Sequence, residues 1–439
     1  MIEERILQNF RDLLSTGGRL WVAYSGGLDS TVLLHYLAHS EFANVVSAVH
    51  VHHGISPNAD AWERGCRENC NAWGVTFECR RTKVDAMNQG LEAAARDARY
   101  AIFQEVIQTN DVLALAHHQD DQAETFMFRL ARGAGLDGLC AIPAIRPLGD
   151  ATLYRPMLKK PRKAFRIYAE RHSLDWVEDE SNKVLRFDRN YLRAKVLPLF
   201  SERWPQFMRS LSRTVSLLDD ARELLDEYAE LDMLACDPRK ERCGHSIDLA
   251  SYEQLSVKRQ HLVLRYCVKR LAYVVPELKQ YDEIDKLLNA REDAVPCVQW
   301  GECELRRFNG RLYLLPQRQP RFIPHEPMAW DGVSLLSLGD GFSLCGSIEV
   351  DADGQSSPLT IRFREPGLRC KPVGRDHSQT LKKLFQEYHV EPWLRNCVPL
   401  IYSGDTLVAV GDIFRCETNI NTSAALLENI QWLYDSKAS

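Results

Sequence analysis

The sequence predicts an α/β protein whose N-terminal domain is a doubly wound parallel sheet. Three observations predict this class. Short apolar runs alternate with segments of helical spacing over the first 140 residues. The composition is that of a globular protein, with 45% hydrophobic and 26% charged residues in a chain of 439. The chain contains no run of about 18 apolar residues, so we expect no membrane-spanning helix and no membrane partner.

The expected strands and helices of this domain follow one another in regular order. Strands are expected at residues 19–24, 45–51, 75–79 and 112–116. Helices are expected at residues 31–39, 57–73, 91–107 and 120–130. Because ligands of such sheets bind at the carboxyl ends of the strands, the places to search for a site follow Tyr24, Val51 and Ala116.

Changes in composition divide the rest of the chain. One or two long helices are expected at residues 199–234, with further helices at 253–271 and 280–290. From about residue 316 prolines interrupt the chain, and short alternating runs such as 342–350 and 406–410 follow. We therefore expect three domains: the catalytic sheet domain at 1–214, a mainly helical domain at 215–318 and a small α+β domain at 319–439.

Charge and cysteine usage bear on the partners and the compartment. The net charge is −5, but residues 155–213 hold 15 Lys and Arg against 7 Asp and Glu, whereas residues 219–248 hold 4 against 10. Such a basic block indicates either a docking surface for a polyanion or a solvated face with local ion pairs. The 13 cysteines include no CxxC pair, and the acidic N-terminus lacks the features of a secretion signal. We therefore expect reduced thiols and a cytoplasmic protein.

The strongest local signal is the string Ser25-Gly26-Gly27-Leu28-Asp29-Ser30, which follows the first strand and opens a helix. Adjacent glycines let the backbone turn tightly and approach an anion, and the N-terminus of the following helix attracts phosphate. The Ser25 and Ser30 hydroxyls can add donors. Asp29 would repel a phosphate directly, so we expect it to hold Mg²⁺. No lysine follows the glycines, which excludes a GxxxxGK[ST] loop.

A second polar string, His117-His118-Gln119-Asp120-Asp121-Gln122-Ala123-Glu124, ends the fourth strand and starts a helix. Asp121 and Glu124 are three residues apart and share one helix face. Three interpretations stay open: a functional acidic site, carboxylates that only complement the helix dipole, and a zinc site, which would need a further ligand. The roles of His52, His53, His117 and His118 also stay open.

These strings resemble those of known families. The string at 25–30 is similar to the PP-loop of the ATP pyrophosphatases, which implies binding of ATP and its cleavage to AMP and pyrophosphate. Residues 15–200 resemble the tRNA(Ile)-lysidine synthetase family. The strings that carry this resemblance are VHVHHGI (49–55), GLEAAARDARY (90–100), HHQDDQAET (117–125), RGAGLDGL (132–139), RPML (155–158) and DESNKVLRFDRNYLRAKVLP (179–198). LKKLFQE (381–387) and PWLR (392–395) are similar to the family's last domain.

The resemblance implies a specific ligase reaction with ATP and Mg²⁺ as cofactors. ATP would adenylate the 2-carbonyl oxygen of the wobble cytidine in an isoleucine tRNA with anticodon CAU. Free L-lysine would then displace AMP and leave lysidine. The main rival on the same fold is a tRNA thiolase, which would need a sulfur-carrying cysteine pair. An ammonia-dependent ligase and a non-catalytic ATP-binding module are further rivals, and the oligomeric state stays open, with a homodimer as one option.

The same resemblance implies which residues form the site. The residues at 25–30 would bind ATP, Asp29, Asp121 and Glu124 would be catalytic, and Asp121 and Glu124 would bind lysine and help to remove its proton. The candidate tRNA-binding residues are basic or polar side chains of the second half of the first domain and of the last domain: Arg132, Arg189, Asn190, Arg193, Lys382 and Lys383. Asn182 is a further candidate for reading an RNA edge.

Overall fold

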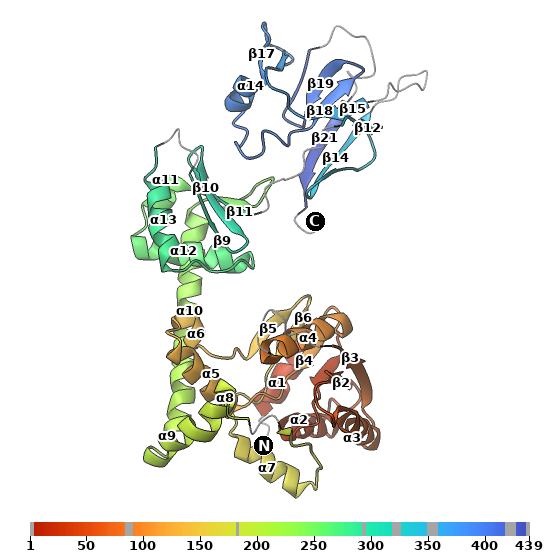
Figure 1. Ribbon diagram of the computed structural model, residues 1–439, viewed down its shortest axis with the longest axis vertical. Coiled ribbons are helices and arrows are strands. Elements are labelled where there is room, and N and C mark those ends of the chain that lie inside the picture. Colours follow the sequence, from red (N-terminus) through yellow and green to blue (C-terminus); the bar gives the residue numbers. More distant parts are fainter. Residues whose placement is uncertain are drawn as a thin grey trace. The chain divides into compact units, whose positions relative to one another are not determined.

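The computed structural model describes residues 4–83, 91–180, 184–291, 296–317, 326–348, 359–417 and 427–435. The chain forms two compact units, Met1–Leu224 and Leu225–Ser439, and each is described by itself (Figure 1). Within the described ranges, no helix is both long and apolar enough to cross a membrane.

The N-terminal unit is built on a six-stranded sheet in the order β3-β2-β1-β4-β6-β5. Its strands are β1 (Leu20–Ala23), β2 (Val46–His52), β3 (Thr76–Arg81), β4 (Val112–Ala114), β5 (Ile145–Leu148) and β6 (Ala151–Tyr154). All neighbours pair in parallel except β5, which lies antiparallel to β6 at the edge. The predicted doubly wound sheet is therefore confirmed. The strand order reverses at β1, whose neighbours are β2 and β4, and the carboxyl ends at such a reversal are where ligands of these sheets bind.

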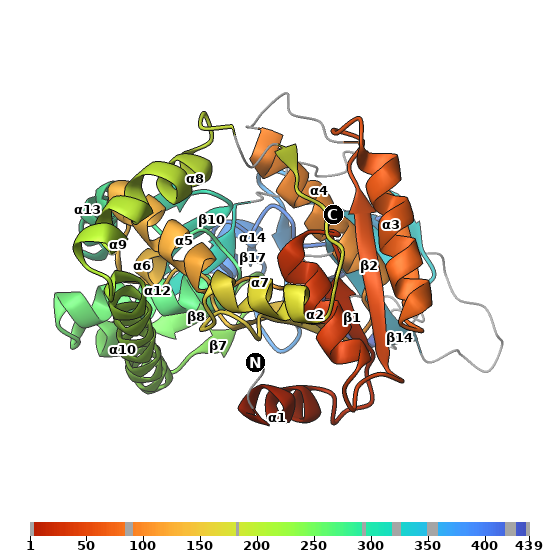
Figure 2. The same cartoon turned by 90° about the horizontal axis from the view of Figure 1, so that it is seen from below.

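Helices cover both faces of this sheet. The helices of the unit are α1 (Glu4–Leu13), α2 (Leu28–Ala38), α3 (Ala59–Ala72), α4 (Leu91–Val106), α5 (Gln119–Ala131), α6 (Leu136–Leu139), α7 (Arg162–Arg171), α8 (Asp188–Tyr191) and α9 (Leu197–Arg203), with a π-helical turn η2 (Leu192–Val196) between the last two. Figure 2 shows α2 and α7 side by side, and both pack with α1 and α3 into one core. On the opposite face Phe103 and Val106 of α4 pack against Trp21 and Leu113.

The strands alternate in burial as a sheet between two helix layers requires. Leu20 and Val22 point into the core with α2, whereas Trp21 points to the core with α4. The indole N–H of Trp21 donates to Asp111 Oδ2 over 3.0 Å, which satisfies the only polar atom of this buried ring. The expected elements of this unit are found within a few residues of their predicted bounds. The hairpin of β5 and β6 was not predicted.

The second unit begins within the long helix α10 (Phe207–Ala235), which the sequence predicts as part of residues 199–234. The predicted helices near 253–271 and 280–290 are α12 (Val257–Arg270) and α13 (Leu278–Leu288), preceded by α11 (Leu249–Glu253). A five-stranded sheet that the sequence analysis did not predict accompanies them. Its strands, in spatial order, are β7 (Arg239–Lys240), β8 (His245–Asp248), β11 (Arg311–Pro316), β10 (Cys303–Phe308) and β9 (Cys297–Trp300).

The C-terminal part of this unit is the expected α+β arrangement. One sheet contains β12 (Met328–Trp330), β15 (Leu359–Arg362), β18 (Leu400–Ser403), β19 (Thr406–Val410) and β20 (Phe414–Arg415). A second contains β13 (Leu336–Gly339), β14 (Phe342–Ile348) and β21 (Leu427–Tyr434), and a short ribbon joins β16 (Arg369–Cys370) to β17 (Gln379–Thr380). The helix α14 (Leu381–Glu387) buries Leu381, Leu384 and Phe385 in their common core.

Candidate active site

The glycine-rich loop after β1 is held in a fixed shape by its own serines. Ser30 Oγ accepts a hydrogen bond from the Ser25 backbone N–H (3.2 Å), lies 3.0 Å from Ser25 Oγ and donates to the Gly27 carbonyl (3.1 Å). Gly27 is the N-cap of α2, and no side chain caps this helix end. The first amides of α2 are therefore not capped by a side chain, which leaves them available to an anionic ligand.

Gly26 is the residue that the loop geometry requires to be glycine. Its φ of +81° lies in the left-handed region. A Cβ at this position would lie 2.8 Å from Cys66 Sγ of α3. The Gly26 carbonyl accepts the backbone N–H of Val177 over 2.9 Å and the Thr31 hydroxyl over 3.3 Å. The loop thus packs closely against Cys66, and the two hydrogen bonds to the Gly26 carbonyl hold its backbone in place.

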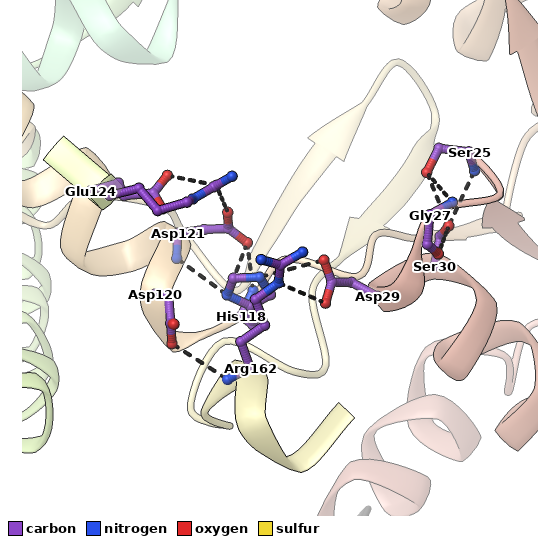
Figure 3. Close-up of polar contacts among 10 residues, drawn as sticks. Ser25, Gly27, Asp29, Ser30, His118, Asp120, Asp121, Glu124 and Arg162 are labelled. Atoms are coloured by element: carbon purple, nitrogen blue, oxygen red, sulfur yellow. Dashed lines mark hydrogen bonds and ion pairs between the residues drawn. The ribbon is translucent and has the colours of Figure 1, made fainter. Parts of the chain in front are cut away.

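Asp29, in the first turn of α2, faces a histidine and an arginine from other parts of the unit. His118 Nε2 lies 3.6 Å from one carboxylate oxygen and Arg162 Nε lies 3.5 Å from the other, as Figure 3 shows. Burial alone would raise the pKa of Asp29, but the nearby His118 and Arg162 outweigh burial and lower it. Asp29 is therefore an anionic carboxylate at the edge of the loop, with 26% of its side chain exposed.

His118 and Asp121 cap the start of α5 reciprocally. The Asp121 carboxylate accepts the backbone N–H of His118 (2.9 Å), and His118 Nδ1 accepts the backbone N–H of Asp121 (3.3 Å). His118 is buried, which disfavours its charged form, yet the carboxylates of Asp29 and Asp121 raise its pKa. The imidazole thereby links the carboxylate at the glycine-rich loop to the carboxylate at α5. These predicted catalytic residues lie at one edge of the sheet.

Glu124 lies deeper in the same helix and already has a strong partner. Its side chain is 1% exposed, and Arg193 of η2 donates to both of its oxygens, over 2.6 Å and 3.0 Å. Burial raises the pKa of Glu124, and the guanidinium opposes that rise. Asp121 is more accessible, with 17% of its side chain exposed and Oδ1 3.7 Å from Arg193. Two carboxylates that look equivalent in sequence therefore differ in their access to a ligand.

His117 points to a different environment, one rich in arginine. Its Nδ1 accepts the Nε–H of Arg155 over 3.2 Å, so its proton is carried on Nε2. Burial and the charges of Arg155, Arg99, Arg189 and Arg96 lower the pKa of His117 well below its ordinary value. The imidazole is therefore neutral and surrounded by positive potential, which favours an anionic ligand at this part of the sheet edge.

The candidate tRNA-binding residues lie in both units. In the N-terminal unit Arg189 and Asn190 lie in α8, Arg193 lies in η2, and Arg132 ends α5 with its guanidinium 4.2 Å from the centre of the Phe128 ring. Arg193 also belongs to the acidic site through Glu124. In the second unit, Lys382 and Lys383 are exposed on α14. Asn182 lies outside the described residues.

Asp29 has one feature expected of a Mg²⁺ ligand. Its Oδ1 is buried and accepts no hydrogen bond, and a carboxylate oxygen is the donor that Mg²⁺ prefers. Arg162 Nε lies 3.5 Å from the same oxygen, so a metal ion there would share the carboxylate with the guanidinium. The zinc interpretation at α5 gains no support, because among the described residues the one convergent group of three candidate ligands is His52, Asp60 and Glu63. There Arg81 donates to both carboxylates over 2.8 Å and already supplies the positive charge.

Neither the position of Arg162 nor the role of His118 was predictable from the local sequence. Arg162 is the first residue of α7, a helix that follows the RPML string, and its backbone N–H is 3.4 Å from Asp120 Oδ1. Nothing in its local sequence distinguishes it from Lys159, Lys160 or Lys163. The adjacent acidic cluster hints at a role for His118, but its partnership with Asp29 depends on the pairing of β1 with β4.

This geometry, a glycine-rich anion site at the strand-order reversal with an ionised carboxylate beside it, is that of a PP-loop nucleotide-binding protein. A PP-loop domain model matches residues 1–200. A TilS substrate binding domain matches residues 248–313, and a TilS substrate C-terminal domain matches residues 359–432.

The chain is also similar over almost its full length to curated proteins. It is 38% identical over 426 residues to tRNA(Ile)-lysidine synthase of Coxiella burnetii (94% of this chain, 93% of that protein). It is 37% identical to the enzyme of the same name from Edwardsiella ictaluri (98% and 98%) and 39% identical to that from Pseudomonas aeruginosa (94% and 93%). The chain belongs to the tRNA(Ile)-lysidine synthase family.

Proposed function

We propose that this protein is an ATP-dependent ligase that joins free L-lysine to carbon 2 of the wobble cytidine in an isoleucine tRNA with anticodon CAU. The observation that carries the proposal is the continuous arrangement of loop, Asp29, His118 and Asp121 at one sheet edge. It supplies an anion site for ATP and a carboxylate for an amine at the same edge of the sheet. The family membership supports the same activity.

The first step is adenylation of the cytosine. The 2-carbonyl oxygen attacks the α-phosphorus of ATP, the bond to the β-phosphate oxygen breaks and pyrophosphate leaves. The open amides at the start of α2 and the Ser25 and Ser30 hydroxyls would bind the phosphates and stabilise the charge that develops on them. Asp29 would hold Mg²⁺, which supplies further positive charge for the phosphates when bound.

The second step is attack of the lysine ε-amine on carbon 2, with AMP as the leaving group and one proton released from the nitrogen. Free lysine has a pKa of about 10.4, so the neutral amine costs about 4.6 kcal/mol at pH 7. A carboxylate can bind the ammonium and accept the proton. Asp121 is the more accessible candidate, whereas Glu124 is 1% exposed and fixes Arg193 beside it.

The tRNA would reach this edge of the sheet through its anticodon loop. The wobble base lies in a single strand, so moving it out of the stack costs little. The arginines near His117 would attract the loop phosphates. A methionine tRNA carries the same anticodon, so discrimination needs distant contacts, for which Lys382 and Lys383 are candidates. The three-domain division at 214 and 318, the cytoplasmic location and the oligomeric state remain predictions.

The thiolase alternative receives less support from the cysteines near the loop. Burial raises the pKa of both Cys66 and Cys70 to about 12, so neither forms a thiolate readily. Cys79 is half-buried and its pKa is raised to about 11. A cysteine that carries sulfur needs an environment that lowers the pKa of its thiol, so that the thiolate forms near neutral pH.

The decisive experiment incubates the full-length protein with ATP, Mg²⁺, labelled lysine and an unmodified isoleucine tRNA transcript, followed by mass analysis of the nucleosides. We expect lysidine at one position, with AMP formed in equal amount, and loss of both products in Asp29→Ala. Incorporation of sulfur, or AMP formation without lysine incorporation, would contradict the proposal.

A second experiment tests the tRNA surface. Arg189→Glu should weaken tRNA binding and reduce the salt dependence of its affinity, because one phosphate contact is replaced by a repulsion. The matched control is Arg64→Glu, an exposed arginine of α3. Equal affinities of the two variants across a salt series would move the tRNA path away from α8.

A further inference from the structure

The glycine-rich loop contains no basic residue, although its proposed ligand is a triphosphate. Residues 25–30 offer hydroxyls, glycine amides and one carboxylate, but no lysine or arginine. In the departure of pyrophosphate, negative charge builds up on the leaving group, and helix amides alone are partial charges. A full positive charge from the protein must therefore come from another segment of the fold.

Arg162 is the side chain that meets this requirement. It lies at the start of α7, and its Nε is 3.5 Å from Asp29 Oδ1, whereas His118 faces the other oxygen, Oδ2 (Figure 3). Its side chain is 40% exposed although Nε is buried, so part of the side chain is accessible to a ligand. α7 packs directly against α2, which fixes the helix from which Arg162 extends.

The contact between Arg162 and Asp29 is incomplete. Asp29 Oδ1 and Arg162 Nε are both buried atoms without a hydrogen-bond partner, although they face one another. A committed Arg–carboxylate pair closes to about 2.7–2.9 Å and uses two parallel hydrogen bonds. Arg193 and Glu124 make such a pair in the same site, at 2.6 Å and 3.0 Å. Arg193 is therefore hydrogen-bonded to both oxygens of Glu124, whereas Arg162 lies beside Asp29 without forming such a pair.

We propose that Arg162 is a catalytic residue that binds the phosphates of ATP and neutralises the departing pyrophosphate. This inference rests on the proposed function and extends it by one residue. The planar fork of the guanidinium matches two phosphate oxygens, which an ammonium cannot do. Asp29 orients the guanidinium next to the loop before ATP arrives.

The test compares Arg162→Ala and Arg162→Lys with Lys163→Ala, which removes the same charge from the next, exposed position of α7. Two quantities are measured on the full-length protein: kcat/KM for ATP in lysidine formation, and the affinity for an ATP analogue with a methylene bridge between the α and β phosphates. We expect Arg162→Ala to lower kcat/KM by about 10²–10³-fold and to weaken analogue binding about tenfold. Arg162→Lys should recover part of the loss, and Lys163→Ala should match the wild type.

Two outcomes would overturn the inference. If tRNA affinity falls while analogue affinity is unchanged, Arg162 is an RNA contact. If Arg162→Ala does not weaken analogue binding further in an Asp29→Asn background, Arg162 acts only through Asp29 and does not touch the phosphates. A thermal unfolding curve of each variant shows that it is folded, and Arg162→Lys retains the test if Arg162→Ala does not fold. Failure of the proposed function is separable, since wild type would then bind the analogue without forming lysidine.

Discussion

Replacing Gly26 with alanine should damage the glycine-rich loop in two separable ways. Alanine at φ +81° costs about 1–2 kcal/mol in backbone energy. The new Cβ would also lie 2.8 Å from Cys66 Sγ and 3.6 Å from Val177 Cγ2, and such overpacking adds about 1–3 kcal/mol. The sum is about 2–5 kcal/mol. In a unit of this size each kcal/mol lowers the unfolding temperature by about 2–4 °C.

Gly17 is the matched control for this substitution. Its φ is +87°, but a Cβ there would meet nothing within 4 Å. Gly17→Ala should therefore show the backbone cost alone, about 1–2 kcal/mol. In Gly26→Ala/Cys66→Ala the sulfur is gone, so the steric part should disappear, and the double variant should be more stable than the sum of the two single effects predicts.

Calorimetry of the full-length protein measures these differences, and the transition of the N-terminal unit is identified by its shift on addition of ATP. Gly26→Ala should also weaken ATP binding, because the Gly26 carbonyl holds the Val177 amide and the Thr31 hydroxyl. Equal unfolding temperatures for Gly26→Ala and Gly17→Ala, or no relief by Cys66→Ala, would refute the packing argument.

Two further predictions concern stability. Glu124→Ala removes two hydrogen bonds to Arg193, whose side chain is 34% exposed and keeps only Asp121 at 3.7 Å, and should destabilise the protein by about 1.5–3 kcal/mol. Removing both side chains should cost less, and calorimetry of the single and double variants decides this. His35 is buried against Tyr168, and burial together with His39 and His172 lowers its pKa to about 4. The unfolded chain therefore binds the proton more readily, so stability should fall as the pH drops from about 6.5 towards 4, and His35→Gln should flatten this part of the stability–pH curve.

Local sequence determined the elements that carry the site. The alternation of apolar runs with helical spacing predicts the strands β1 to β4 and the helices between them, because burial between two helix layers requires apolar strands. The loop at 25–30 was predictable for a similar reason. Its adjacent glycines and serines have few other structural uses directly after a buried strand.

The second unit was predicted less completely. Apolar residues of the strands β8 to β11 pack against α12 and α13 in one core, but the local sequence does not say which strands pair. The hairpin of β5 and β6 was missed because its partly exposed first strand carries a proline, which weakens a strand signal. Pairing between strands supplies the missing information, and pairing is not a local property.

The sequence by itself determined the loop, the acidic start of α5 and the resemblance that connects them to a reaction. Only the tertiary structure decided which partner each charged side chain has: Asp29 faces His118 and Arg162, while Glu124 is paired with Arg193. The physical reason is that an ionised group's role depends on burial and on charges within a few ångströms. Those neighbours come from the N-cap of α5, from α7 and from η2, which the parallel sheet brings to one edge.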